Sequence, residues 1–222
     1  ADSVSAYLDR LKEFLFDNDF KSKSAVVAIP QEEVFVRTVK VPPMSDKDLN
    51  NFIKYESAQY IPLPLEDVTL GYDKMPATIA EKDTMSVLLV AAKKVTVERY
   101  TSIVKSSGLV PVAMEPESLA MTRALKTPFG SSYAELIVEM GPEQTLIVLS
   151  HNGYVVLTRT VPFGDLSLIR ALTQALDLDI NQAIEYKNTY GIDSTKVEGK
   201  VYNVLAPVFD KVIAEIKKSR AF

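Results

Sequence analysis

The second half of the chain holds three strand-like segments in direct succession, and three helix-like segments follow them. The strands are expected at residues 134–140, 145–150 and 154–161, and the helices at 165–176, 179–190 and 204–219. Gly141 separates the first two strands and Asn152-Gly153 the second and third; Asn-Gly is the strongest short signal for a hairpin turn. This order predicts a set of hairpin-connected strands followed by helices.

The first half has a different order of elements. Residues 25–115 are expected to form two strands, a helix, two strands, a helix and a strand, an α+β unit that can bury its own core. An amphipathic helix at residues 4–16 precedes this unit, and a helix at residues 118–126 follows it. The boundary between the halves is placed at residues 127–132, where Pro, Gly and Ser interrupt the periodic pattern.

Local signals predict where individual helices begin and end. Ser45 is placed to cap the first helix of the α+β unit, and Asp48 three residues later completes the pattern of a capping box. That helix is expected to end before Pro62, because proline disfavours helical geometry at the residue before it. Gly108 follows the next helix, at the position where glycine commonly ends one.

Composition excludes several classes of function. The net charge is −4 over 222 residues, so the surface does not favour phosphate backbones or anionic lipid, and nucleic acid is not an expected partner. The chain has no cysteine and one histidine, His151, which excludes disulfides, thiolate zinc sites and multi-histidine metal sites. No apolar run approaches the roughly 20 residues of a membrane span, so we expect a soluble protein that reaches a membrane only through a partner.

Four stretches of the sequence carry a family resemblance. They are residues 55–68, in which a helix runs into the turn IPLPL, residues 88–94 (LLVAAKK), residues 108–120 (GLVPVAMEPESLA) and residues 159–164 (RTVPFG). In this order they resemble the PilM family of type IV pilus assembly proteins, within the FtsA/PilM group. The resemblance implies an actin-like, ribonuclease H-like α/β fold with an inserted α+β subdomain.

The resemblance covers the middle portion of the family, so the fold is expected to be incomplete. The family opens with an Asp-x-Gly phosphate loop and continues to a Gly-Gly adenosine loop, and neither occurs in this sequence. The implied division is the end of the first actin-like subdomain at residues 1–24, the inserted partner-binding subdomain at 25–115, a connecting helix and linker at 116–132, and part of the second actin-like domain at 133–222.

A candidate nucleotide site follows from the same resemblance. The residues implied are Glu139, Gly141, Gln144, Thr145, Gly164 and Lys187. In the family an aspartate holds Mg²⁺ through water and a glycine turn approaches the phosphates; here Glu139 replaces the aspartate and Pro142 removes an N–H donor. A tight hairpin that needs only Gly141 for its backbone angles is the alternative interpretation.

The adenine side departs from the family pattern as well. The family carries Ala-Glu-x-x-Lys on a helix; Lys187 matches the lysine, but Ile184 stands where the glutamate belongs. A solvated helix with one apolar face is the alternative. ATP and Mg²⁺ are therefore expected only in the complete fold, and we expect neither tight binding nor hydrolysis by this chain alone.

The stretch Tyr60, Ile61, Pro62, Leu63 and Pro64 is the candidate partner site. Its two prolines hold an extended conformation between apolar residues, as the wall of a peptide-binding groove can do. The alternative is a loop buried against its own core. In the PilM family this subdomain helps to hold the N-terminal cytoplasmic tail of the membrane protein PilN.

The resemblance thus implies a scaffold of the type IV pilus inner-membrane platform. It would be cytoplasmic and peripheral to the inner membrane, would link a PilN-like peptide to the pilus motor ATPases, and could form homo-oligomers or rings. The alternatives are an actin-like ATPase or kinase, an FtsA-like division protein, or a type II secretion platform protein. FtsA ends in a membrane-binding amphipathic helix, whereas the amphipathic helix at residues 204–219 is expected to lie in the core of the second domain.

Overall fold

The computed structural model describes residues 2–76, 83–125 and 134–219. The chain divides into two compact units: residues 1–133 together with 151–156, and residues 134–150 together with 157–222. The boundary expected at residues 127–132 lies outside the described residues. The finer division into actin-like subdomains stays a prediction.

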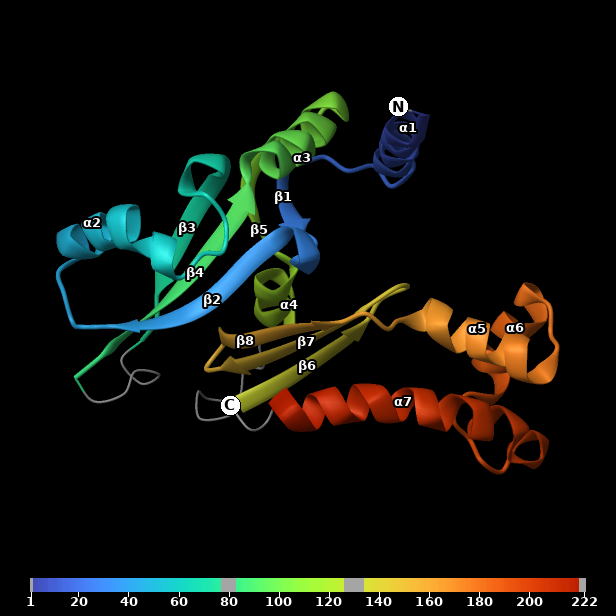
Figure 1. The fold of residues 1–222 in the computed structure, drawn as a ribbon. Helices are drawn as coiled ribbons and strands as arrows, with labels where there is room; N and C mark the ends of the chain where they lie inside the picture. The colour runs from blue at the N-terminus through green and yellow to red at the C-terminus, as the bar shows by residue number, and fades with distance from the viewer. Residues whose placement is uncertain (1, 77–82, 126–133, 220–222) are drawn as a thin grey trace. The chain divides into compact units, whose positions relative to one another are not determined.

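The first unit contains two sheets and four helices among its described residues (Figure 1). Its elements are α1 (Asp2–Asp17), β1 (Ser24–Ile29), β2 (Val34–Val41), α2 (Asp46–Glu56), β3 (Val68–Lys74), β4 (Met85–Lys93), α3 (Lys94–Ser106), β5 (Val110–Pro116) and α4 (Glu117–Leu125), with short 3₁₀ turns at Gln31–Glu33, Ser57–Gln59 and Leu65–Asp67. All the strands and helices expected here from periodicity are present.

β2, β4 and β3 form an antiparallel sheet with β4 in the centre. Alternate residues of β4 face opposite sides: Val87 and Leu89 pack with Leu49 and Ile53 of α2, while Ala92 packs on the other side. This explains the continuous apolar run at residues 87–92 of β4, because a central strand covered on both faces has no side that favours polar residues.

β1 and β5 form a separate, two-stranded parallel sheet that runs from Ser24 opposite Val110 to Ile29 opposite Pro116, with a shift of register between Ala25 and Val26. The unit expected at residues 25–115 therefore contains two sheets. The local signals identified all five strands but gave no information on which strands pair.

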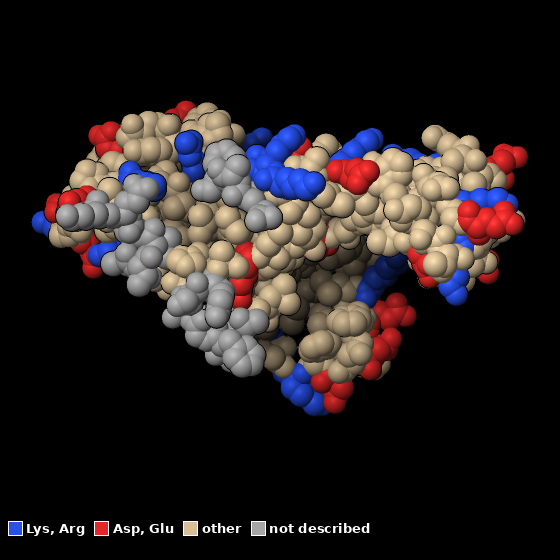
Figure 2. All heavy atoms as spheres, turned by 90° about the horizontal axis from the view of Figure 1, so that it is seen from below, with Lys and Arg blue, Asp and Glu red and all other residues tan. Residues whose placement is uncertain are grey.

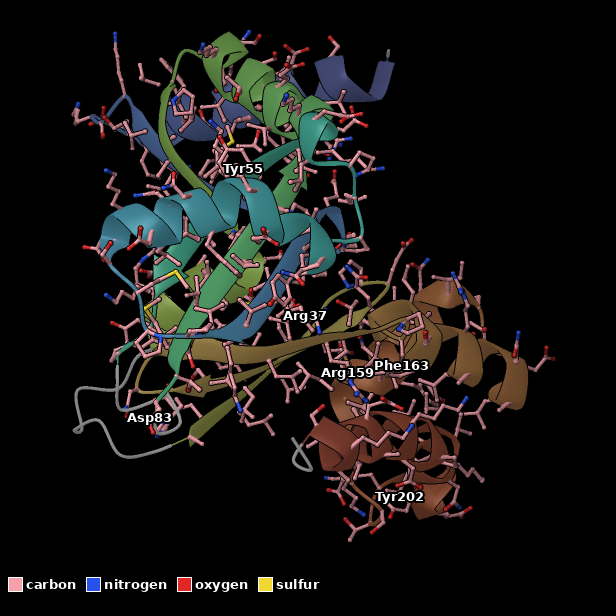
Figure 3. All side chains as sticks on the ribbon, turned by 60° about the vertical axis from the view of Figure 1, so that its left-hand side comes forward. Arg37, Tyr55, Asp83, Arg159, Phe163 and Tyr202 are labelled. Atoms are coloured by element: carbon pink, nitrogen blue, oxygen red, sulfur yellow. The ribbon has the colours of Figure 1, made fainter. Side chains whose placement is uncertain are left out.

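The ends of the helices follow the sequence signals. The Ser45 side chain accepts a hydrogen bond from the Asp48 N–H and caps α2, and Gly108 after α3 has φ +86°. α2 ends at Glu56, and a 3₁₀ turn at Ser57–Gln59 follows it, so the helix ends before Pro62 as expected. On the exposed side of α2, Tyr55 points outward (Figure 3).

The second half of the chain forms the sheet β6-β7-β8, followed by helices. Its elements are β6 (Ala134–Met140), β7 (Thr145–His151), β8 (Tyr154–Val161), α5 (Asp165–Leu176), α6 (Ile180–Tyr190), a 3₁₀ turn at Val197–Gly199 and α7 (Lys200–Ser219). Asn152 (φ +55°) and Gly153 (φ +76°) both adopt the left-handed conformation between β7 and β8. The predicted Asn-Gly hairpin turn is confirmed.

One hydrophobic core holds the second unit together. Phe163, labelled in Figure 3, packs there with Leu172 of α5, Ala183 of α6 and Leu205 of α7. These three helix residues are at most 1% exposed. α7 therefore belongs to the core of this unit, as expected for residues 204–219.

Candidate functional site

A backbone hydrogen bond spans the turn between β6 and β7. The Gly141 N–H donates a hydrogen bond to the Gln144 carbonyl over 2.9 Å. Glu139 is exposed and lies beside the turn, since a Cβ on Gly141 would be 3.6 Å from its Oε1. The turn is therefore the tight hairpin that the sequence allowed, with its glycine N–H used inside the turn.

Gly164 lies directly against this turn. A Cβ added to Gly164 would be 2.4 Å from the Gly141 carbonyl oxygen and 2.6 Å from the Gln144 nitrogen. Both atoms belong to the backbone, so they cannot move aside as a side chain could. Glycine at this position is thus required by the close approach of two backbone segments.

The first N–H groups of α5 are also satisfied within the unit. Asp165 N–H donates to the Gly141 carbonyl and Leu166 N–H to the Pro142 carbonyl, both over 2.9 Å. Ser167 N–H donates to the Gly164 carbonyl over the same distance. A helix N-terminus binds anions through such donors. Here two of these N–H groups donate to carbonyl oxygens of the β6–β7 turn instead.

Thr145 is completely buried at the start of β7. Its Oγ1 donates a hydrogen bond to the Phe163 carbonyl over 2.7 Å. This bond ties β7 to the segment that leads from β8 into α5. The geometry gives Thr145 a structural role at the start of β7.

Lys187 is joined to the same region through an aspartate. Its Nζ donates to both carboxylate oxygens of Asp165, over 2.5 and 2.6 Å. Ile184, one turn earlier on α6, packs against the core of the second unit. The structure thus brings Gly141, Gln144, Thr145, Gly164 and Lys187 into one region.

Asp165 was not identified as a site residue from the sequence. An acidic residue in the first turn of a helix is a common stabilising choice, so it carried no separate signal. Its partner lies on another helix, and only the packing of α5 on α6 brings the two side chains together.

The residues of the candidate partner site, 60–64, differ in burial. The Tyr60 ring packs at 6.2 Å from the Phe52 ring, and Ile61 is 4% exposed in a cluster with Val68 and Ala91. For Ile61, the alternative interpretation, a loop buried against its own core, is therefore the better description. Pro62 and Pro64 are exposed, and Leu63 is half-buried.

Pro62 and Leu63 line a hollow in the first unit. Its volume is about 380 Å³, and the lining residues are Glu32, Glu33, Val34, Phe35, Pro62, Leu63, Lys93 and Thr96. Apolar groups from β2 and from the proline stretch are combined with charged groups of both signs. Such a mixture suits an extended segment with an apolar side chain and polar flanks.

Glu33 fixes one side of this hollow. Its carboxylate accepts hydrogen bonds from the Tyr100 hydroxyl over 3.0 Å, from Thr96 over 3.3 Å and from the Arg99 guanidinium. Burial, and then the hydrogen bond to Glu33, raises the pKa of Tyr100. These bonds attach the turn before β2 to α3, so this wall is held in place before any ligand arrives.

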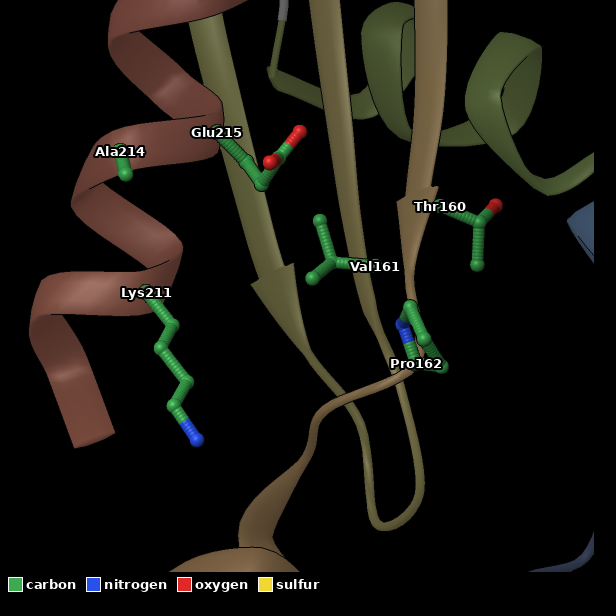
Figure 4. Close-up of a pocket in the computed structure, with 6 residues that line it drawn as sticks. All are labelled: Thr160, Val161, Pro162, Lys211, Ala214 and Glu215. Atoms are coloured by element: carbon green, nitrogen blue, oxygen red, sulfur yellow. The ribbon is translucent and has the colours of Figure 1, made fainter.

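A second hollow, of about 470 Å³, lies between the end of β8 and α7 (Figure 4). Thr160, Val161 and Pro162 form one side, and Lys211, Ala214 and Glu215 the other. Glu215 accepts a hydrogen bond from Arg159 over 2.7 Å, which holds α7 to β8. Sequence reasoning did not single out this hollow.

The surface carries no single dominant charge in the view of Figure 2, where acidic and basic side chains of the described residues are interspersed. No helix within residues 2–76, 83–125 and 134–219 is both long and apolar enough to cross a membrane. In the same ranges, no group of three His, Cys, Asp or Glu residues is arranged to hold a metal ion.

Solved structures are similar to this chain. A protein of the PilM–PilN type IV pilus biogenesis complex matches 96% of the chain at 24% identity and a TM-score of 0.76, over 62% of its own length. MreB5 of Spiroplasma citri bound to ADP matches 96% of the chain at 12% identity and a TM-score of 0.52, over 57% of its own length. The chain thus spans less than two thirds of either protein.

The cytoplasmic domain of EpsL, an inner-membrane component of the Vibrio cholerae type II secretion system, matches 76% of the chain and 59% of its own length, at 18% identity and a TM-score of 0.49. The likeness to the PilM and MreB5 structures establishes an actin-like fold. The family described as type IV pilus assembly protein PilM matches residues 1–222, and the protein therefore belongs to that family.

Proposed function

We propose that this protein is a scaffold of type IV pilus assembly that binds a short extended peptide, the N-terminal tail of a PilN-like membrane protein, in the hollow beside Pro62 and Leu63. Family membership supports the role in pilus assembly, and the solved PilM–PilN complex supports the class of partner. In this role the protein would work at the cytoplasmic face of the inner membrane and connect the partner to the pilus motor.

The observation that carries this proposal is the composition of the hollow. Val34, Phe35, Pro62 and Leu63 offer apolar surface for a side chain of the peptide. Lys93 offers a cation beside that surface. Because Glu33 already accepts three hydrogen bonds, the wall is pre-organised, which reduces the entropy lost on binding.

The test is a calorimetric titration of the purified chain with a synthetic peptide that copies the N-terminal tail of its PilN-like partner. We expect saturable one-to-one binding. Pro62→Arg should place a long charged side chain in the hollow and weaken binding roughly tenfold or more, since filling a pocket removes its apolar contacts.

Pro64→Arg is the matched control, because Pro64 is exposed in the same turn but does not line the hollow. Its affinity should stay close to that of the unchanged chain. Ile61 is unsuitable for this test since its burial means that a substitution would disturb the core. Equal affinities for both arginine variants, or no binding by the folded chain, would contradict the proposed site.

A further inference from the structure

Lys187 binds the carboxylate of Asp165 through both oxygens, as a lysine can bind an anionic ligand. Lys187 Nζ lies 2.5 and 2.6 Å from the two carboxylate oxygens of Asp165, and the lysine side chain is only 17% exposed. Asp165 begins α5 and Lys187 lies in the last turn of α6. Each charge is therefore at the helix end that favours it.

The backbone N–H groups beside this pair also have partners within the protein. The N–H groups of Asp165 and Leu166 donate to the carbonyl groups of Gly141 and Pro142 in the β6–β7 turn. An incoming phosphate group would have to displace those carbonyl oxygens from α5 and the carboxylate from Lys187. As it stands, this region does not fit a phosphate group.

We propose that Asp165 is an internal anion that occupies Lys187 in place of an external ligand, so that α5 and α6 are joined without a nucleotide. The carboxylate is covalently attached and already positioned, so a free anion must compete with a very high local concentration of it. Ile184 supports the same conclusion, because the side chain one turn before Lys187 packs into the core and offers no polar group to a ligand.

The proposal goes beyond peptide binding and can fail independently of it. The test compares the unchanged chain with Asp165→Asn, which keeps the shape of the side chain and removes its charge. Binding of pyrophosphate and of ATP, each with and without Mg²⁺, is measured by calorimetry and by the shift of the thermal unfolding midpoint. We expect no saturable binding by the unchanged chain.

Asp165→Asn should gain affinity for both anions by roughly tenfold or more, because a charge-assisted hydrogen bond from Lys187 becomes available to them. The gain should disappear in the double variant Asp165→Asn, Lys187→Met. Asp177→Asn is the matched control: it makes the same change at the other end of α5, at an exposed residue, and should bind like the unchanged chain.

Two results would overturn the proposal. One is tight binding of ATP by the unchanged chain that Lys187→Met abolishes, since Lys187 would then be available despite Asp165. The other is a folded Asp165→Asn variant whose affinity for both anions is unchanged. Should Asp165→Asn not fold, Asp165→Ser answers the same question with a side chain that is also favoured near a helix start.

Discussion

The hollow beside Leu63 and the turn beside Gly164 each contain residues of a candidate ligand site, and they differ in whether their polar groups already have partners inside the protein. At the hollow, the hydrogen bonds of Glu33 hold the wall, while apolar surface and the Lys93 side chain still face the open space. At the turn, N–H groups and carbonyl groups satisfy each other, and Lys187 is paired with Asp165.

This difference shows that matching residue types do not by themselves make a binding site. A site needs groups whose interactions are left for a ligand, because every donor already used inside the protein must be released first. At the turn these groups are already paired within the protein, whereas Leu63 and Lys93 line an open hollow. Four measurements test which contacts hold the turn and the hollow in place.

The largest effect is expected at the closed turn. Gly164→Ala would place a Cβ 2.4 Å from the Gly141 carbonyl oxygen, so two backbone segments must separate. We expect a loss of about 3 kcal/mol in the free energy of unfolding, measured by chemical denaturation. Gly71→Ala is the control because a Cβ at that residue would have nothing within 4 Å, and it should be close to neutral. Equal stability of the two variants would mean that the turn does not pack against Gly164.

The second effect tests whether Thr145 has a structural role. Thr145→Val keeps the size of the side chain but removes the donor to the Phe163 carbonyl, which is then left without this bond. The expected loss is roughly 2 kcal/mol in the free energy of unfolding. Thr160→Val makes the same change at an exposed residue of β8 and should lie within about 0.5 kcal/mol of the unchanged chain. A neutral Thr145→Val would show that the bond contributes little.

The third effect concerns the wall of the hollow. Glu33→Gln removes the charge that accepts hydrogen bonds from Thr96, Arg99 and Tyr100, and we expect a loss of roughly 1 kcal/mol in stability. Glu32→Gln, at the exposed neighbouring residue, should cost less. If the two variants were equally stable, the wall would not depend on Glu33.

The smallest effect is a dependence on pH in the second unit. Hydrogen bonds from Lys218 and then Arg159 hold the pKa of Glu215 below its ordinary value of 4.5. The stabilisation is therefore complete above pH 4.5 and is lost as the pH falls through the lower pKa of the folded protein.

Thermal unfolding of the unchanged chain and of Glu215→Gln, followed from neutral to acid pH, checks this. The two unfolding midpoints should differ at neutral pH and converge in acid, whereas Glu185→Gln, at an exposed residue of α6, should run parallel to the unchanged chain. A difference that stays constant into strong acid would contradict the assignment.

Much of the fold could be predicted because its signals are local. The cap at Ser45, the turn at Asn152-Gly153 and the continuous apolar run of β4 each determine the structure of a few neighbouring residues. The actin-like fold followed from the resemblance. The pairing of β1 with β5 could not be predicted, because it depends on contacts between distant segments.

The candidate sites were predictable only as regions. Sequence order identified Pro62 and Leu63 but could not show that the neighbouring Ile61 would enter the core. It identified Lys187 but not Asp165, since the partner of a long side chain is chosen by helix packing. The sequence shows which residue types are present. It does not show which of their polar groups are already paired within the folded protein.

The order in which the paired strands follow one another in the sequence also affects how the first unit folds. β3 and β4 are joined by one hairpin connection, β2 lies outside both in the sequence, and β1 and β5 enclose all of them. Loop closure costs more entropy as the loop becomes longer. Formation of the β3–β4 hairpin, addition of β2, and last the pairing of β1 with β5 is therefore the least costly sequence of events, and the parallel pair closes a module that is already folded.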